Sequence, residues 1–165
     1  MSRSFHDEFV EVFNGHFQRV RRYLHRLSGE PQLAADLAQD TFIKLYQRGS
    51  LPQTPEAWLI TVATNLFRNE RSKHRRRARL LTMEMGQGPG ASVSSADARD
   101  SCRHVRRVLD GLPERERSLL LLRAEGYSYR DISIALGIHE ASVGTLLARA
   151  KRAFLELHGG DPDAS

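Results

Sequence analysis

Three polar side chains, Asp36, Gln39 and Asp40, lie about one helical turn apart within the stretch DLAQDTFIKLYQ. Apolar residues, among them Leu37 and Leu45, recur around them at the intervals of three or four that are typical of an amphipathic helix. Two carboxylates could hold a metal, but Asp36 and Asp40 lack a third ligand of comparable placement. The remaining alternatives are a face that is merely solvated, which is the common case, or a surface that contacts a partner.

A second polar surface follows in the long helical pattern after Thr54. Between Arg68 and Arg79 the chain carries seven Lys or Arg residues against a single acid, Glu70. The helix dipole favours cations at a helix end, but seven exceed what the dipole explains, so this run predicts contact with a polyanion. The preceding turns carry hydroxyls and amides, including Thr64, which suit hydrogen bonds to unstacked bases. The residues expected to contact nucleic acid are Asn65, Arg68, Arg71, Ser72, Arg75 and Arg76.

A third surface is expected near the C-terminus, where SYRDISIALGIHEASVGTLLARAKRAF has the pattern of a helix-turn-helix. Ser128 begins a capping box, Ser133 is small enough for two helices to approach, and Gly137 permits the left-handed backbone of a tight turn. A plain helical hairpin with a glycine turn is the alternative, but it does not require this combination of residues. The second helix of such a motif lies in the major groove of DNA. Its outward side chains, expected to contact phosphates and base edges, are Ser142, Thr145, Arg149 and Arg152.

Catalytic and cofactor-binding patterns are absent from the sequence. The seven His residues form no HExxH motif and no close ligand pair, and Cys102 is the only cysteine. There is no glycine-rich phosphate loop and no Gly-x-Ser-x-Gly elbow. We therefore expect no enzyme activity, no cofactor, no metal and no intramolecular disulfide.

The composition is that of a folded protein with an anionic partner. The 165 residues include 25 Lys and Arg and 20 Asp and Glu, so that the formal net charge is 25 − 20 = +5, and the sequence pI is about 9.9. The N-terminal residues lack the apolar core of a signal peptide, and no apolar run is long enough to span a membrane. The expected location is the cytoplasm, without membrane insertion.

The elements that must position these surfaces are helices, and the fold class expected is all-α. Residues 5–28, 31–48 and 55–79 have helical patterns that end or begin at Gly, Pro and Thr signals. Residues 83–95 are rich in Gly, Pro and Ser and indicate a flexible linker. Helical patterns resume near Asp97 and continue to Leu157. The domains expected are residues 1–80, a linker over 81–100, and a helix-turn-helix domain over 101–160.

The motifs resemble one family. AADLAQDTFIKLYQ with TPEAWLITVATNLFRNERSKHRR resembles the conserved region 2 domain of bacterial sigma-70 factors, and LPERERSLLLLRAEGYSYRDISIALGIHEASVGTLLARAKRAF resembles their region 4. The small size and two-domain layout are similar to the extracytoplasmic-function (ECF) group. The resemblance covers roughly residues 9 to 157, and the two motifs in this order are more specific than either alone.

The resemblance implies a transcription initiation factor. Residues 1–80 would bind core RNA polymerase and the opened −10 promoter element, and residues 101–160 would bind the −35 element. Asp36, Gln39 and Asp40 would contact the clamp coiled coil of the polymerase. The resemblance therefore favours a partner-binding surface over a face that is merely solvated. Like charge would also keep this acidic face away from DNA phosphates. An anti-sigma factor is a further partner implied by the family.

Two points qualify the resemblance. A stand-alone helix-turn-helix regulator that binds duplex DNA as a dimer is the alternative function, and it would bind its operator without polymerase. The recognition helix also departs from the family pattern at His139, Gly144 and Leu146, where a capping residue and two basic residues are usual. Gly144 either allows close approach of the backbone to DNA or reflects drift at a tolerant position. Thr145 and Arg149 are left as the main candidates for reading bases.

Overall fold

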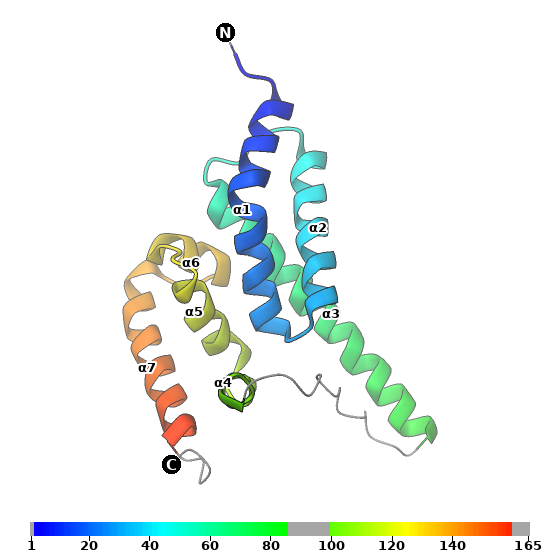
Figure 1. The fold of residues 1–165 in the computed structure, drawn as a ribbon, viewed down its shortest axis with the longest axis vertical. Helices are drawn as coiled ribbons and strands as arrows, with labels where there is room; N and C mark the ends of the chain where they lie inside the picture. Colours follow the sequence, from blue (N-terminus) through cyan, green and yellow to red (C-terminus); the bar gives the residue numbers. More distant parts are fainter. Residues whose placement is uncertain (1, 86–99, 160–165) are drawn as a thin grey trace.

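The computed structural model describes residues 2–85 and 100–159, and every regular element in these two ranges is an α-helix. The expected all-α fold is confirmed. Helices α1 (Phe5–Ser28), α2 (Pro31–Arg48) and α3 (Pro55–Met85) form an N-terminal group (Figure 1). Helices α4 (Asp100–Asp110), α5 (Glu114–Ala124), α6 (Tyr129–Leu136) and α7 (Glu140–Gly159) form a C-terminal group, with α5 and α6 on the side that faces the N-terminal group.

The first helix begins and ends at local signals in the sequence. The Ser4 hydroxyl accepts a hydrogen bond from the Asp7 backbone N–H and caps the N-terminus of α1. Gly29 ends α1 with a φ of 75°, and a Cβ built at this position would lie 2.6 Å from a nitrogen of the Arg106 guanidinium. The positive φ favours glycine here, whereas the flexible end of the Arg106 side chain, from α4, could move away from a Cβ.

An aromatic row joins α1 to α2. Phe9, Phe13 and Phe17 follow one another along α1, and the ring of Phe42 on α2 contacts all three at centroid distances of 6.4, 5.1 and 5.6 Å. The row continues into Val20 and Leu24, which are fully buried. The four-residue spacing of the phenylalanines puts their rings on one face of α1, and the three rings are partly buried against the core.

Helix α3 is longer than the sequence analysis expected. It continues past Arg79 to Met85, so residues 81–85 belong to a helix and not to the expected linker. The hydroxyl of Thr82 donates to the Ala78 carbonyl at 2.6 Å, as in a regular helix, and Leu80 and Leu81 are good helix formers. Asp100, the last residue of the expected linker, begins α4, and residues 86–99 lie outside the described residues.

The helix-turn-helix is present as α6 and α7. The Ser128 hydroxyl accepts from the Asp131 N–H, and Gly137 ends α6 with a φ of 67°. Ile132 and Val143 are fully buried between the helices. The capping residue, the turn glycine and the apolar wedge are thus where the motif requires them.

The two groups of helices pack against each other. Helix α6 lies against α3 and α5 lies against α1 (Figure 1). The buried apolar residues form one cluster that includes Leu24 of α1, Ala63 of α3 and Leu119 of α5. Side chains at this contact, which would face solvent in two separate domains, are therefore buried between the two groups of helices.

Candidate nucleic-acid and protein interfaces

The acidic face of α2 is open to solvent. Asp36, Gln39 and Asp40 are exposed, while Leu37 and Leu45 on the other side of the helix are buried. Asp36 accepts a hydrogen bond from Gln32 Nε2 at 3.1 Å, and both side chains lie on the surface. The spacing of the sequence thus gives the predicted common face, and this face is free for a partner.

An aromatic groove lies directly beside this face. Phe9, Phe13, Gln39, Ile43 and Tyr46 are among the residues that line a cavity of about 480 Å³ between α1 and α2. The side chains of Ile43 and Tyr46 are 51% and 53% exposed. Since Gln39 belongs to both surfaces, the groove extends the acidic face.

Two of these residues were not identified as surface residues by the sequence analysis. Tyr46 follows the apolar Phe42 by four residues, a spacing that suggests a buried side chain, but its ring is half exposed and contacts Phe5 and Phe9 at centroid distances of 6.0 and 5.1 Å. Ile43 follows Asp40 by three residues and Asp36 by seven, so helical spacing alone could have placed it on the acidic face.

The basic surface of α3 is divided. Asn65, Ser72, Arg75 and Arg76 are exposed and available to a ligand. Arg68 and Arg71, in contrast, are half-buried and face Glu114, the first residue of α5. Arg68 Nε lies 3.8 Å from Glu114 Oε1, and Arg71 Nη1 lies 3.6 Å from Glu114 Oε2. The six residues predicted as one contact surface are therefore in two different environments.

Thr64 was expected on this polar stripe, and the structure corrects that expectation. Its side chain is fully buried, and its hydroxyl lies 2.9 Å from the hydroxyl of Tyr23 on α1. Burial raises the pKa of Tyr23. The periodicity of α3 placed Thr64 toward solvent, but Tyr23 of α1 covers this part of the helix.

The outward face of α7 is open. Thr145, Arg149 and Arg152 are exposed and Ser142 is half-buried, whereas Val143, Leu147 and Ala150 face the core. These four polar residues remain on one side of the helix, as predicted from their spacing. A row of hydroxyls and guanidinium groups on an exposed helix can contact phosphates and base edges.

Gly144 and Leu146 differ in their surroundings. A Cβ at Gly144 would lie 3.6 Å from Cε2 of Tyr129, which is an ordinary van der Waals contact. Leu146 is partly buried against the core. A leucine at this position thus packs inward, and the protein gains apolar contact where the family usually has a cation.

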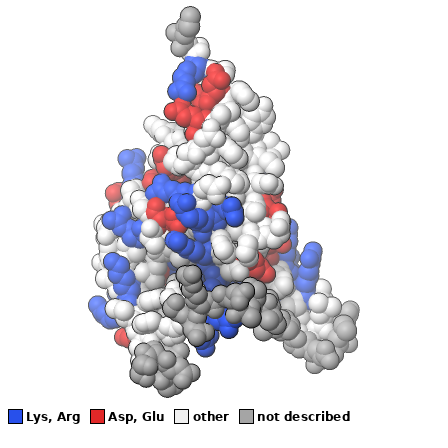
Figure 2. Space-filling view, in the orientation of Figure 1, with Lys and Arg blue, Asp and Glu red and all other residues white. Residues whose placement is uncertain are grey.

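Arginines of α1 hold the C-terminal group through Glu125. The Glu125 side chain is 6% exposed, and its carboxylate lies 2.9 Å from Arg26 Nη1 and 3.3 Å from Arg22 Nη2. Arg19 donates from Nε to the Glu125 carbonyl at 2.9 Å, and its guanidinium lies 3.9 Å from the centre of the Tyr127 ring. Figure 2 shows Lys and Arg side chains gathered over the middle of the molecule, in the region where the two groups meet.

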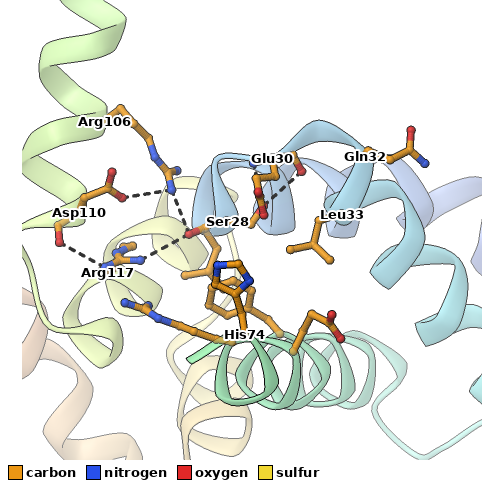
Figure 3. A pocket seen from close by; sticks show the side chains of 12 residues that line it. Ser28, Glu30, Gln32, Leu33, His74, Arg106, Asp110 and Arg117 are labelled. Atoms are coloured by element: carbon orange, nitrogen blue, oxygen red, sulfur yellow. Dashed lines mark hydrogen bonds and ion pairs between the residues drawn. The ribbon is translucent and has the colours of Figure 1, made fainter. Parts of the chain in front are cut away.

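The end of α1 is held in the same way from the other side. Arg106 of α4 donates to the carbonyls of Arg26 and Leu27. Arg117 of α5 also donates to the Leu27 carbonyl, at 3.5 Å, and Figure 3 shows both arginines pointing at this end of α1. Burial, and to a smaller extent the nearby Arg71, lowers the pKa of Arg117. Together with His74 of α3 these side chains line a cavity of about 460 Å³ between the groups.

The arginine contacts could not be found from the sequence. Arg22 and Glu125 are separated by 103 residues along the chain, so no helical spacing relates them.

Within the two described ranges, no three His, Cys, Asp or Glu side chains are arranged to hold a metal ion. Among the same residues, no helix is both long enough and apolar enough to cross a membrane.

Comparison with known proteins gives two family matches that together cover most of the chain. Residues 12–77 match the model of sigma-70 region 2, and residues 103–154 match that of sigma-70 region 4. The first segment contains the acidic face and most of the basic stretch of α3. The second contains the helix-turn-helix.

Whole proteins are similar over most of the chain. EcfG, an ECF RNA polymerase sigma factor of Rhodopseudomonas palustris, is 33% identical over 81% of this chain and 74% of its own length. The RNA polymerase sigma factor CarQ of Myxococcus xanthus is 30% identical over 92% of this chain and 87% of its own length. The ECF factor SigE of Mycolicibacterium smegmatis is 30% identical over 92% of this chain, which spans 63% of the length of SigE.

A solved structure has the same fold. The sigma factor RpoE of Bartonella quintana, in complex with the anti-sigma factor NepR, aligns with a TM-score of 0.68 over 93% of this chain and 98% of its own. The sequence identity is 24%, and the likeness therefore concerns the arrangement of the helices.

Proposed function

The chain belongs to the sigma-70 family, in its ECF group, and on this premise we propose that it joins core RNA polymerase, directs it to promoters and helps to open the DNA. One observation carries the proposal. The same chain has two separate surfaces suited to nucleic acid, on α3 and α7, and an acidic surface on α2 that would repel DNA.

The chemistry of each surface suits a different partner. Asp36, Gln39 and Asp40 bind the polymerase, and the adjoining aromatic groove accepts an apolar side chain of the same partner. The residues on the outward face of α7 read the duplex −35 element: Ser142, Thr145, Arg149 and Arg152. The α3 residues bind opened −10 DNA: Asn65, Arg68, Arg71, Ser72, Arg75 and Arg76.

Two further statements belong to the proposal. An anti-sigma factor is a regulatory partner, because the similar RpoE of Bartonella quintana is found in complex with one. The cytoplasm is the location where core polymerase and chromosomal DNA are accessible. Neither a catalytic residue nor a cofactor is part of the proposed function.

Run-off transcription tests the proposal against a stand-alone regulator. Purified chain, core polymerase and a set of promoter fragments should give specific transcripts only when both proteins are present. A stand-alone helix-turn-helix regulator would instead bind its operator tightly without polymerase and add no transcript. Specific duplex binding by the chain alone, together with failure to support transcription from any fragment that it binds, would therefore refute the sigma-factor function.

A further inference from the structure

Glu114 lies against part of the proposed opened-DNA surface of α3. Its carboxylate lies within 4 Å of both Arg68 and Arg71, two residues proposed to bind opened DNA. A carboxylate and a phosphate present similar oxygen acceptors to a guanidinium group. The C-terminal group thus brings an anion of its own to part of the DNA-binding surface.

This ion pair is incompletely satisfied. Arg71 Nη1 and Glu114 Oε1 are buried atoms, and neither forms a hydrogen bond within the part of the chain that the structure describes. Both distances, 3.8 and 3.6 Å, are too long for good hydrogen bonds. Charges that lose water without gaining hydrogen bonds gain little stability from their attraction.

The contrast with Glu125 shows that the interface contains two kinds of contact. Glu125 Oε1 lies 2.9 Å from Arg26 Nη1 and Oε2 lies 3.3 Å from Arg22 Nη2, so both oxygens of this carboxylate have a close partner. Glu114 is held by longer contacts. Glu125 therefore anchors the C-terminal group on α1, and Glu114 forms a weaker contact on α3 that a better ligand can replace.

We propose that Glu114 competes with DNA phosphate for Arg68 and Arg71, so that the C-terminal group and opened DNA bind the same surface of α3 in turn. This inference rests on the proposed function and concerns the regulation of that same site. Helix α6 lies against α3, so DNA that follows α3 must displace this contact. The exposed residues Arg75 and Arg76, farther along α3, remain available for a first encounter.

The competition can be measured on the full-length chain without polymerase. The probe is a fluorescein-labelled single-stranded oligodeoxynucleotide of mixed sequence, and binding is followed by anisotropy at several salt concentrations. Glu114→Gln keeps the shape of the side chain but removes its charge, and we expect about a three- to fivefold increase in affinity, in line with the modest strength of a partly exposed ion pair. Glu114→Asp, which withdraws the carboxylate, should give a smaller increase.

A matched control separates this effect from net charge. Glu116→Gln changes the charge by the same amount two residues along α5, and Glu116 forms no ion pair within the described ranges. It should leave the affinity within about twofold, because a charge that pairs with neither Arg68 nor Arg71 acts on DNA only from a distance, where salt screens it. In a background that lacks both guanidinium groups, Arg68→Ala with Arg71→Ala, the gain from Glu114→Gln should vanish.

Two results would overturn the inference. One is an equal gain from Glu114→Gln and Glu116→Gln, and the other is a gain that persists without Arg68 and Arg71. Run-off transcription with excess core polymerase is measured on the same variants. Normal transcription alongside either result rejects the competition and leaves the sigma-factor function intact, whereas loss of transcription by the unchanged chain would reject the function itself.

Discussion

Replacement of Glu125 by Gln should loosen the contact between the two groups of helices. The carboxylate is nearly buried, and it holds Arg22 and Arg26 of α1 against the C-terminal group. Glutamine keeps the size of the side chain and can still accept one hydrogen bond. The change thus removes the charge and leaves the packing around Tyr127 in place.

The expected magnitude follows from the exposure of the partners. Breaking a fully buried pair costs about 3–5 kcal/mol. Arg22 and Arg26 are 55% and 52% exposed, so they regain water when the carboxylate is neutralised. We therefore expect a loss of about 1–2 kcal/mol from the packed arrangement, which corresponds to about a 5- to 30-fold shift toward separated groups.

Energy transfer between two dyes measures this shift. Cys102 on α4 is exposed and is the only cysteine in the sequence, and Gln47→Cys on α2 provides a second exposed site. Transfer should fall in the Glu125→Gln protein. Added salt should reduce transfer in the protein that retains Glu125 and have less effect on the variant, because salt screens the exposed arginines.

The control is Glu156→Gln, an exposed acid of α7 that forms no ion pair among the described residues. The energy-transfer efficiency of this variant should equal that of the labelled protein in which Glu125 and Glu156 are unchanged. Equal transfer in the Glu125→Gln variant at low salt would show that apolar packing alone holds the groups together, and the reasoning about this ion pair would then be wrong.

Three further outcomes are expected. Alanine at Asp36, Gln39 and Asp40 together should weaken core polymerase binding at least about tenfold, measured by co-sedimentation, with unchanged helical circular dichroism because all three are exposed; unchanged affinity contradicts the assignment. Arg149→Ala should relax preference at one base pair of the −35 element by about 1–3 kcal/mol in competition binding, whereas an equal loss for all sequences would make it a phosphate contact only. Gly144→Ala should raise the melting temperature by about 2–4 °C, since alanine adds about 1 kcal/mol of helix stability and its Cβ fits beside Tyr129. A lower melting temperature would show that the site requires glycine.

The elements of the fold could be predicted because their limits depend on neighbouring residues. Gly29 and Gly49 both have the positive φ that ends a helix, and Ser128 forms the predicted cap. Such signals act within a few residues of the chain. The end of α3 was misjudged because the end of the basic run at Arg79 does not by itself stop a helix.

The candidate sites could be predicted only in part, for the same physical reason. Helical spacing correctly grouped Asp36 with Asp40, and Thr145 with Arg149, since the residues of each pair lie on one helix. Spacing cannot show which face another part of the chain covers. Thr64 is buried and Arg71 is paired with Glu114 because of contacts between segments that are far apart in the sequence.

The positions of the acids therefore matter more than their number. The chain has 20 of them against 25 cations, and a net charge of +5 describes a protein with a general attraction for DNA. Glu114 lies on the proposed opened-DNA surface, whereas Thr145 and Arg149 of the recognition helix are exposed. The duplex-reading surface of α7 is therefore available from the start. The whole surface for opened DNA becomes available only after phosphate replaces Glu114. Promoter opening would then require the two groups to separate first, and so the strength of the Glu125 anchor would set how readily the free chain binds single-stranded DNA.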